Sequence, residues 1–218
     1  MIINFTISAP AEIFLFLWFM LKYRNMTNEV VLDIETQNTF QEVGSRDCGL
    51  LKVSLLVAYF YKTDEYKTYF EKDLPALWRE LQFSERIIGY NLKGFDYPVL
   101  NNYAPFDLFS LPTIDLMEEV QKNLGFRIKL DDIAQGSLGI GKSGNGLDAV
   151  RFWKNQELQK LSEYCCQDVK VTKEVYEYGL KNKFVEFSDY LSGQKRQVPV
   201  DFSFKEKPRK ATNLTLGL

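Results

Sequence analysis

Two carboxylates, one residue apart, close an apolar run near residue 30. Residues 30–36 read Val-Val-Leu-Asp-Ile-Glu-Thr. In a β-strand, Asp33 and Glu35 would share one face, while Leu32 and Ile34 would pack on the other. Two such charges repel each other and are costly to bury, so they require a cation between them or a protonated carboxylate. A hard divalent metal ion would supply that cation; the alternative is a strand end whose carboxylates face water.

Two later stretches carry residues that could join this pair. In residues 88–100, a short strand would deliver Asn91, and Asp96 would lie in the first turn of the next helix. In residues 164–168, Tyr164 and Asp168 are four apart, which places both on one face of a helix. Alone, Asp96 could be a helix-capping carboxylate, and the later pair an ordinary amphipathic pattern. Together and in this order, the three stretches indicate one site.

Composition excludes several classes of catalysis. The 218 residues include no histidine, which excludes Ser-His-Asp and Cys-His catalysis and His-ligated zinc. Cys48, Cys165 and Cys166 are too few for a Cys-only zinc site or a disulfide framework, so we expect a cytoplasmic protein. With a net charge of −2, the protein does not have the excess of basic residues that is typical of a protein that coats DNA. Nucleic acid would therefore meet local Lys and Arg or metal-screened carboxylates.

The hydrophobic pattern predicts the elements that would position these residues. Strands are expected over 50–61, 66–70 and 86–90, and a helix is expected after an N-cap at Asp73, with Pro75 in its first turn. Further helices are expected over 94–102, 116–124 and 130–138, and one or two over 156–180. A strand hairpin followed by alternating helices and strands indicates an α/β fold, with a mixed sheet covered by helices.

Both ends of the chain differ from this expected domain, which we place at residues 26–190. Residues 1–25 form an apolar extension whose run over 13–21 is shorter than the about 20 residues needed to span a bilayer. It could be an interfacial anchor, a docked helix or a translated upstream stretch, and we favour the third, with an authentic start at Met26. Residues 191–218 are expected to be a tail with an edge strand over 198–204. A basic cluster follows the strand, and we interpret it as solvated: Lys205, Lys207, Arg209 and Lys210.

Two other motifs have simpler explanations. Residues 136–143, Gly-Ser-Leu-Gly-Ile-Gly-Lys-Ser, fit the P-loop pattern. A P-loop follows a strand and opens a helix, whereas residues 129–135 have a helical pattern, so we expect a flexible loop carrying Lys142. Cys165 and Cys166 are expected to be one buried and one half-exposed residue on a helix rather than a redox pair.

The three acidic stretches resemble the motifs of the DEDD 3'-5' exonucleases, in the branch whose third motif carries tyrosine. Asp-Ile-Glu-Thr at 33–36, Tyr-Asn-x-x-x-Phe-Asp-x-Pro-x-Leu at 90–100 and Tyr-Cys-x-x-Asp at 164–168 look most like the proofreading exonuclease domain of family B DNA polymerases. The resemblance covers about residues 30–179 and implies an RNase H-like mixed β-sheet flanked by α-helices. It implies a stand-alone exonuclease domain, with a separate polymerase or helicase as a candidate partner. Independently of the resemblance, we expect no membrane partner.

The resemblance also implies roles for individual residues. Asp33 would bridge two divalent ions, Mg²⁺ or Mn²⁺, and Asp96 would hold one of them. Glu35 and Asp168 would complete the site that activates water, and Tyr164 would orient that water. Three further residues resemble positions that contact the terminal nucleotide: Thr36, Asn91 and Phe95. Phe95 would offer a face for base stacking, with a place in the core as the alternative.

The expected function is metal-dependent 3'-5' exonuclease activity at nucleic-acid 3' ends. Single-stranded DNA is favoured over RNA only because the motifs look most like those of polymerase proofreading domains. The alternative is a non-catalytic nucleic-acid-binding or assembly module that keeps the fold. A third hypothesis is an endonuclease that uses the same ions, which would release oligomers instead of mononucleotides.

Overall fold

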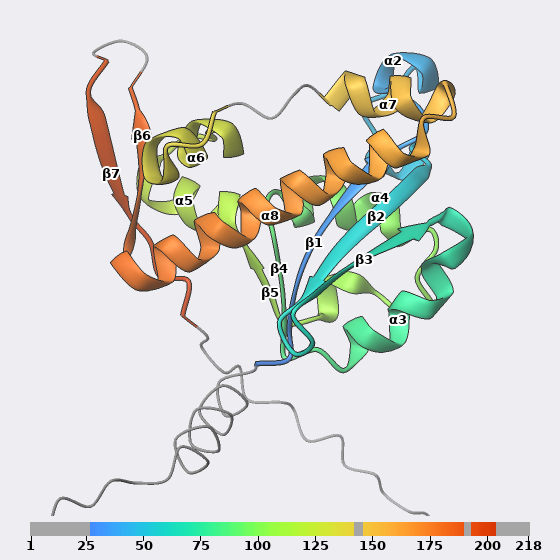
Figure 1. Ribbon diagram of the computed structural model, residues 1–218, viewed down its shortest axis with the longest axis horizontal. Helices are drawn as coiled ribbons and strands as arrows, with labels where there is room; N and C mark the ends of the chain where they lie inside the picture. Colours follow the sequence, from blue (N-terminus) through green and yellow to red (C-terminus); the bar gives the residue numbers. More distant parts are fainter. Residues whose placement is uncertain (1–26, 142–145, 190–192, 204–218) are drawn as a thin grey trace, which may run out of the picture.

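A five-stranded mixed sheet is the centre of the computed structural model, which describes residues 27–141, 146–189 and 193–203 (Figure 1). The strand order is β3-β2-β1-β4-β5. β1 lies in the middle, antiparallel to β2 and parallel to β4. The predicted mixed α/β sheet flanked by helices is confirmed. The strands are β1 (Glu29–Thr36), β2 (Val53–Phe60), β3 (Glu65–Phe70), β4 (Arg86–Gly89) and β5 (Thr113–Asp115).

Helices cover both faces of this sheet. The long helix α8 crosses one face (Figure 1), where it contacts β1 and β2, and α3 lies on the other face. The predicted bounds of α5 and α6 are confirmed, and the helix predicted over 156–180 is the single helix α8. None of the helices in the described chain is both long and apolar enough to cross a membrane. The helices are α2 (Phe40–Val43), α3 (Leu74–Gln82), α4 (Tyr97–Leu100), α5 (Leu116–Leu124), α6 (Leu130–Leu138), α7 (Gly146–Lys154) and α8 (Leu158–Asn182).

Side chains of β1 alternate between two hydrophobic cores, as the sequence predicts. Val31 belongs to the core beneath α8, and Leu32 and Ile34 belong to the core beneath α3 and α4. Asp33 and Glu35 therefore lie on the α8 face of the sheet.

Several predicted boundaries were wrong. Residues 48–50 form a 3₁₀ turn, so β2 starts at Val53 rather than at residue 50. The helix predicted after Asp73 is confirmed as α3, with Asp73 at its N-cap position and Pro75 in its first turn. The Asp73 side chain itself makes no capping hydrogen bond, because a 3₁₀ turn over Glu71–Asp73 leads directly into the helix. The helix predicted over 94–102 is instead a π-helical turn, Leu92–Asp96, followed by α4.

The C-terminal part of the described chain forms a second, two-stranded sheet. β6 (Phe184–Ser188) pairs with β7 (Lys195–Pro199), so the edge strand predicted over 198–204 was wrong in position. Val198 and Phe202 join the core beneath α8. The boundary that we placed at residue 190 lies between these two paired strands. Both the N-terminal extension and the basic cluster after residue 204 lie outside the described residues.

The P-loop-like motif begins inside a helix, as expected. Gly136 belongs to α6, and Gly139 ends that helix with φ 72°. A Cβ atom on Gly136 would lie 2.3 Å from the carbonyl oxygen of Glu186, so this glycine allows α6 to pack directly on β6. Lys142 and Ser143 lie outside the described residues. Cys165 is buried and Cys166 is half-buried, as predicted.

Candidate active site

The end of β1 places the first two carboxylates. Asp33 and Glu35 are half-buried on the α8 face, opposite Val57 and Leu55 of β2 in the strand register. The register shifts between Glu35 and Thr36, where the strand leaves the sheet. The two carboxylates therefore lie beside each other at the point where β1 meets α8.

The loop after β4 places the third carboxylate. Asn91 has the left-handed backbone conformation, with φ 66°, and the π-helical turn that follows ends at Asp96. The Asp96 side chain is only 2% exposed and accepts a hydrogen bond of 3.2 Å from the backbone N–H of Ile34. Because Ile34 lies between Asp33 and Glu35, this contact fixes Asp96 against the same segment of β1.

Helix α8 brings the last two predicted residues to the cluster. Tyr164 and Asp168 are both half-buried, and both interact electrostatically with Glu35. Cys165 is fully buried. Its thiol lies 3.6 Å from Oδ2 of Asp33 and 3.5 Å from the backbone carbonyl oxygen of Asp33. This contact joins α8 to the acidic end of β1.

Burial and mutual repulsion raise the pKa values of the clustered groups. Burial raises the pKa of Asp33 well above its usual value, and Asp96, Glu35 and Asp168 raise it further. The pKa of Glu35 is raised well above its usual value by burial and then by Asp168 and Asp96. Burial raises the pKa of Asp96 to about 8, although the N–H of Ile34 partly opposes the shift. The ionised cluster is therefore unfavourable without a compensating cation.

The Tyr164 phenol remains protonated at neutral pH. Its pKa is raised by burial first and then by Asp168, Glu35 and Asp33. It can donate a hydrogen bond, but it is not a strong base.

The donor atoms fit a hard divalent cation. Ligand atoms of Asp33, Glu35 and Cys165 all lie within 4.8 Å of one another, and Asp96 and Asp168 add carboxylate oxygens nearby. Mg²⁺ and Mn²⁺ prefer oxygen ligands. The buried Cys165 thiol, whose pKa is raised by burial and by the carboxylates, is a poor ligand for either ion. The four carboxylates would therefore hold the metal.

The three predicted substrate contacts have different surroundings. Thr36 is buried, and its hydroxyl donates to the carbonyl oxygen of Asn38 at 2.9 Å. Oδ1 of Asn91 is buried and has no hydrogen-bond partner among the described residues. Phe95 is half-buried against the core, and its ring packs edge-on against that of Phe40, with centroids 6.2 Å apart. Of the three, Asn91 is the one with a buried side-chain atom that has no hydrogen-bond partner among the described residues.

Asp115, a buried carboxylate next to the loop of Asn91, was not predicted from the sequence. Its oxygens accept hydrogen bonds from the backbone N–H groups of Asn91 and Lys93 as well as from the first turn of α5. The pattern Asp-Leu-Met-Glu before a predicted helix could have identified a helix cap. It could not have identified the contact with Asn91, which depends on the pairing of β4 with β5.

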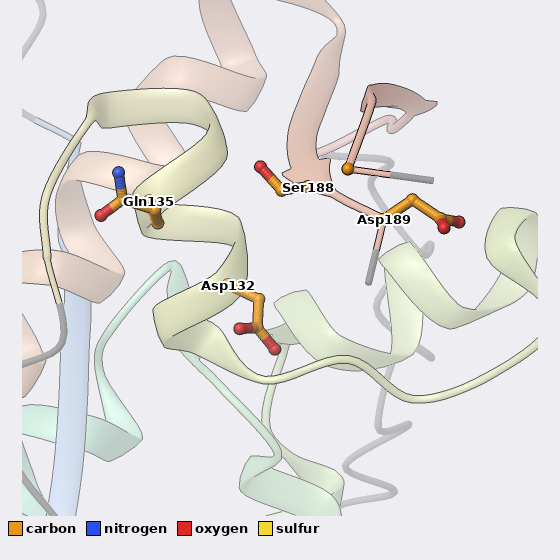
Figure 2. Close-up of a pocket in the computed structure, with 5 residues that line it drawn as sticks. Asp132, Gln135, Ser188 and Asp189 are labelled. Atoms are coloured by element: carbon orange, nitrogen blue, oxygen red, sulfur yellow. The ribbon is translucent and has the colours of Figure 1, made fainter. Parts of the chain in front are cut away.

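A separate hollow of about 360 Å³ lies between α6 and the hairpin of β6 and β7. Figure 2 shows Asp132 and Gln135 of α6 across from Ser188 and Asp189. None of the predicted site residues lines this hollow in the described part of the chain. The candidate active site is instead the cluster on β1, α8 and the loop after β4.

Comparison with known proteins relates the chain to one superfamily. A family model described as the RNase_H superfamily matches residues 30–179, and no curated protein matches the chain in a sequence search. Among solved structures, the chain is similar to the family B DNA polymerase from the hyperthermophilic archaeon Pyrobaculum calidifontis, with a TM-score of 0.56 and 18% sequence identity. The match covers 70% of this chain and 24% of the polymerase chain, so this chain spans about a quarter of that protein's length.

Proposed function

The chain belongs to the RNase H superfamily, and we propose that it is a metal-dependent 3'-5' exonuclease. The observation that carries the proposal is the crowding of four carboxylates from three separate segments: Asp33, Glu35, Asp96 and Asp168. Such crowding raises the energy of the metal-free protein and is useful where divalent cations must bind beside a phosphate.

Each residue of the cluster has a role in this proposal. The carboxylates of Asp33, Glu35, Asp96 and Asp168 would hold two divalent cations. When bound, such ions lower the pKa of the attacking water. Their positive charge also stabilises the negative charge that develops on the phosphate and on the leaving oxygen. Tyr164 keeps its proton at neutral pH and orients the attacking water by a hydrogen bond. Asn91, Thr36 and Phe95 would border the terminal nucleotide.

We favour DNA over RNA as the substrate, because a similar solved structure is that of a DNA polymerase. A single strand with a free 3' end would enter the site, and a separate polymerase or helicase would be the partner. The alternative function is a non-catalytic nucleic-acid-binding module. A binding module has no need to crowd four carboxylates where a phosphate must approach, so the cluster favours the exonuclease.

Cleavage of labelled oligonucleotides tests this proposal. The purified protein is incubated with 5'-labelled single-stranded DNA and RNA of equal sequence, with Mg²⁺, with Mn²⁺ and with EDTA. We expect a metal-dependent ladder that shortens from the 3' end, with DNA shortened faster than RNA. Short internal fragments at the earliest times would instead indicate an endonuclease.

Two variants make the test specific to the cluster. Asp33→Ala should abolish cleavage, whereas Asp107→Ala, which removes the carboxylate that caps the 3₁₀ turn Leu108–Ser110, should cleave as the wild type does. Equal cleavage by Asp33→Ala, after contaminating nucleases are excluded, would overturn the site assignment. Binding of both strands without cleavage under any condition would support the binding module.

A further inference from the structure

Asp115 is a buried carboxylate that does more than cap a helix. It is 2% exposed and lies at the junction of β5 and α5. Its Oδ1 accepts hydrogen bonds from the N–H groups of Met117, at 3.1 Å, and Glu118, at 3.4 Å. These two contacts are those of an ordinary N-cap.

The same carboxylate also binds the loop that follows β4. Oδ1 accepts the N–H of Asn91 at 2.8 Å, and Oδ2 accepts the N–H of Lys93 at 3.0 Å. The register of the sheet explains this contact, because Gly89 of β4 lies opposite Asp115 of β5. The chain leaving β4 therefore passes directly over the Asp115 carboxylate.

The loop held in this way has an unusual backbone. Asn91 has a positive φ of 66°, and a π-helical turn follows it; both features are rare and need support from their surroundings. Gly94 leaves room for the Asn91 side chain, since a Cβ atom there would lie 2.3 Å from Oδ1 of Asn91. The turn ends at Asp96, whose carboxylate accepts the N–H of Ile34.

We propose that Asp115 is a positioning residue of the active site. By holding the N–H groups of Asn91 and Lys93, it fixes the conformation of the loop and so places the Asp96 carboxylate beside Asp33 and Glu35. It also fixes the Asn91 side chain. This inference rests on the proposed exonuclease function. Asp115 acts through the backbone of the loop, in the way that groups behind a metal ligand orient it.

Two substitutions separate this role from helix capping. Serine and asparagine cap helices about as well as aspartate does, so Asp115→Ser and Asp115→Asn should keep α5. Serine is too short to hold the loop as well as the helix. Asparagine keeps one oxygen, but its NH₂ group takes the place of the second carboxylate oxygen. In the wild type that second oxygen also accepts a backbone N–H, which an NH₂ group cannot do. The matched control is Val120→Ala, which removes buried packing from α5 but none of the hydrogen bonds to the loop.

Two measurements on the full chain distinguish the outcomes. The first is kcat and KM on a single-stranded oligonucleotide over a range of Mg²⁺ concentrations, and the second is a titration with Mn²⁺ that reports binding without activity. Both Asp115 variants should lose roughly 10- to 100-fold in kcat or in Mn²⁺ affinity, the usual effect of removing a partner behind a metal ligand. Higher Mg²⁺ should restore part of kcat, and Val120→Ala should lower the melting temperature without either loss.

Either measurement can overturn the proposal. It is wrong if both variants bind Mn²⁺ as the wild type does and keep its kcat, or if Val120→Ala shows the same losses at an equal drop in melting temperature. A wild type that binds Mn²⁺ but cleaves no nucleic acid would refute the exonuclease. The Mn²⁺ titration of the variants would then still decide whether Asp115 positions Asp96.

Discussion

At the scale of single residues, the site combines groups that repel each other with groups that fix them. Glu35 and Asp168 raise the pKa of Asp33, Asp168 raises that of Glu35, and all three carboxylates raise that of Tyr164. The backbone N–H of Ile34 holds the Asp96 carboxylate in place, and the Cys165 thiol donates to that of Asp33. Repulsion of this kind supplies affinity for cations, and the fixed geometry supplies their positions.

Tyr164 provides a test at this scale. In Tyr164→Phe, the hydroxyl that orients water is lost, while the ring can keep its edge-on contact with Phe152, whose centroid is 6.5 Å away. We expect kcat to fall by about 10²-fold, with little change in the melting temperature.

The pH profile checks the assigned role of the phenol. Because its pKa is raised above the ordinary value, Tyr164 should not titrate between pH 6 and 9. The shape of the kcat profile should therefore be the same in wild type and in Tyr164→Phe. A basic limb that disappears in the variant would show that the phenol acts as an acid or base.

At the scale of elements, the sequence predicted those with strong local signals. α5 and α6 have clear apolar faces, and each ends at a glycine with positive φ, Gly125 and Gly139. The pair Asp33 and Glu35 was predictable because a strand must place alternate residues on one face. These signals lie within a few residues of each other along the chain.

The elements that the sequence did not predict depend on distant partners. β6 and β7 are short and polar on one side. Their apolar residues can be recognised as core only once β6 packs on α6 and α8 and β7 contacts α5. The π-helical turn depends on Asp115, which lies on a neighbouring strand. The sequence carries no local signal for contacts of this kind.

Gly136 tests how closely two of these elements must pack. In Gly136→Ala, the new methyl group would lie 2.3 Å from a backbone oxygen of β6, so α6 and the hairpin must separate. We expect the free energy of unfolding to fall by about 1–3 kcal/mol, as for other overpacked sites, in chemical denaturation.

Gly146→Ala is the matched control, since a Cβ atom at this end of α7 would meet no atom within 4 Å. It should be neutral or stabilising by up to about 1 kcal/mol. An equal loss in both variants would mean that close packing is not the cause.

At the scale of the whole molecule, a buried polar network joins both ends of the described chain. Arg86 pairs with Glu29 at the start of β1, hydrogen-bonds to Tyr176 of α8, and donates to the carbonyl oxygen of Phe202 at 3.1 Å. The Phe202 ring packs against Tyr176 and lies over Gly179. The described residues that follow β7 therefore belong to the hydrophobic core beneath α8.

Phe202 tests this dependence on the C-terminal segment. Its side chain is fully buried, so Phe202→Ala should lower the free energy of unfolding by about 3–5 kcal/mol. Phe83→Ala, at a phenylalanine that is 69% exposed, should change it by less than about 0.5 kcal/mol. A small effect at Phe202 would show that the segment is dispensable for the fold.

The charge of the cluster should also govern how the stability of the whole protein depends on pH. In the metal-free folded protein, the pKa of Asp96 is about 8, and those of Asp33 and Glu35 are raised well above their ordinary values. In the unfolded chain these groups ionise near pH 4. Between about pH 4 and the raised pKa values, the carboxyl groups are protonated in the folded protein but ionised in the unfolded chain. The free energy of unfolding should therefore fall as the pH rises through this range.

Chemical denaturation in EDTA at pH 6 and pH 9 measures this loss, with ionic strength held constant. Asp96→Asn should lose less stability over this interval, because one of the groups that must ionise is gone. Mn²⁺ or Mg²⁺ binds the ionised carboxylates, so either ion should stabilise the wild type more at pH 9 than at pH 6. Stability that stays constant or rises with pH in EDTA would mean that the carboxylates are already ionised at pH 6, and that the cluster is less strongly coupled than its burial implies.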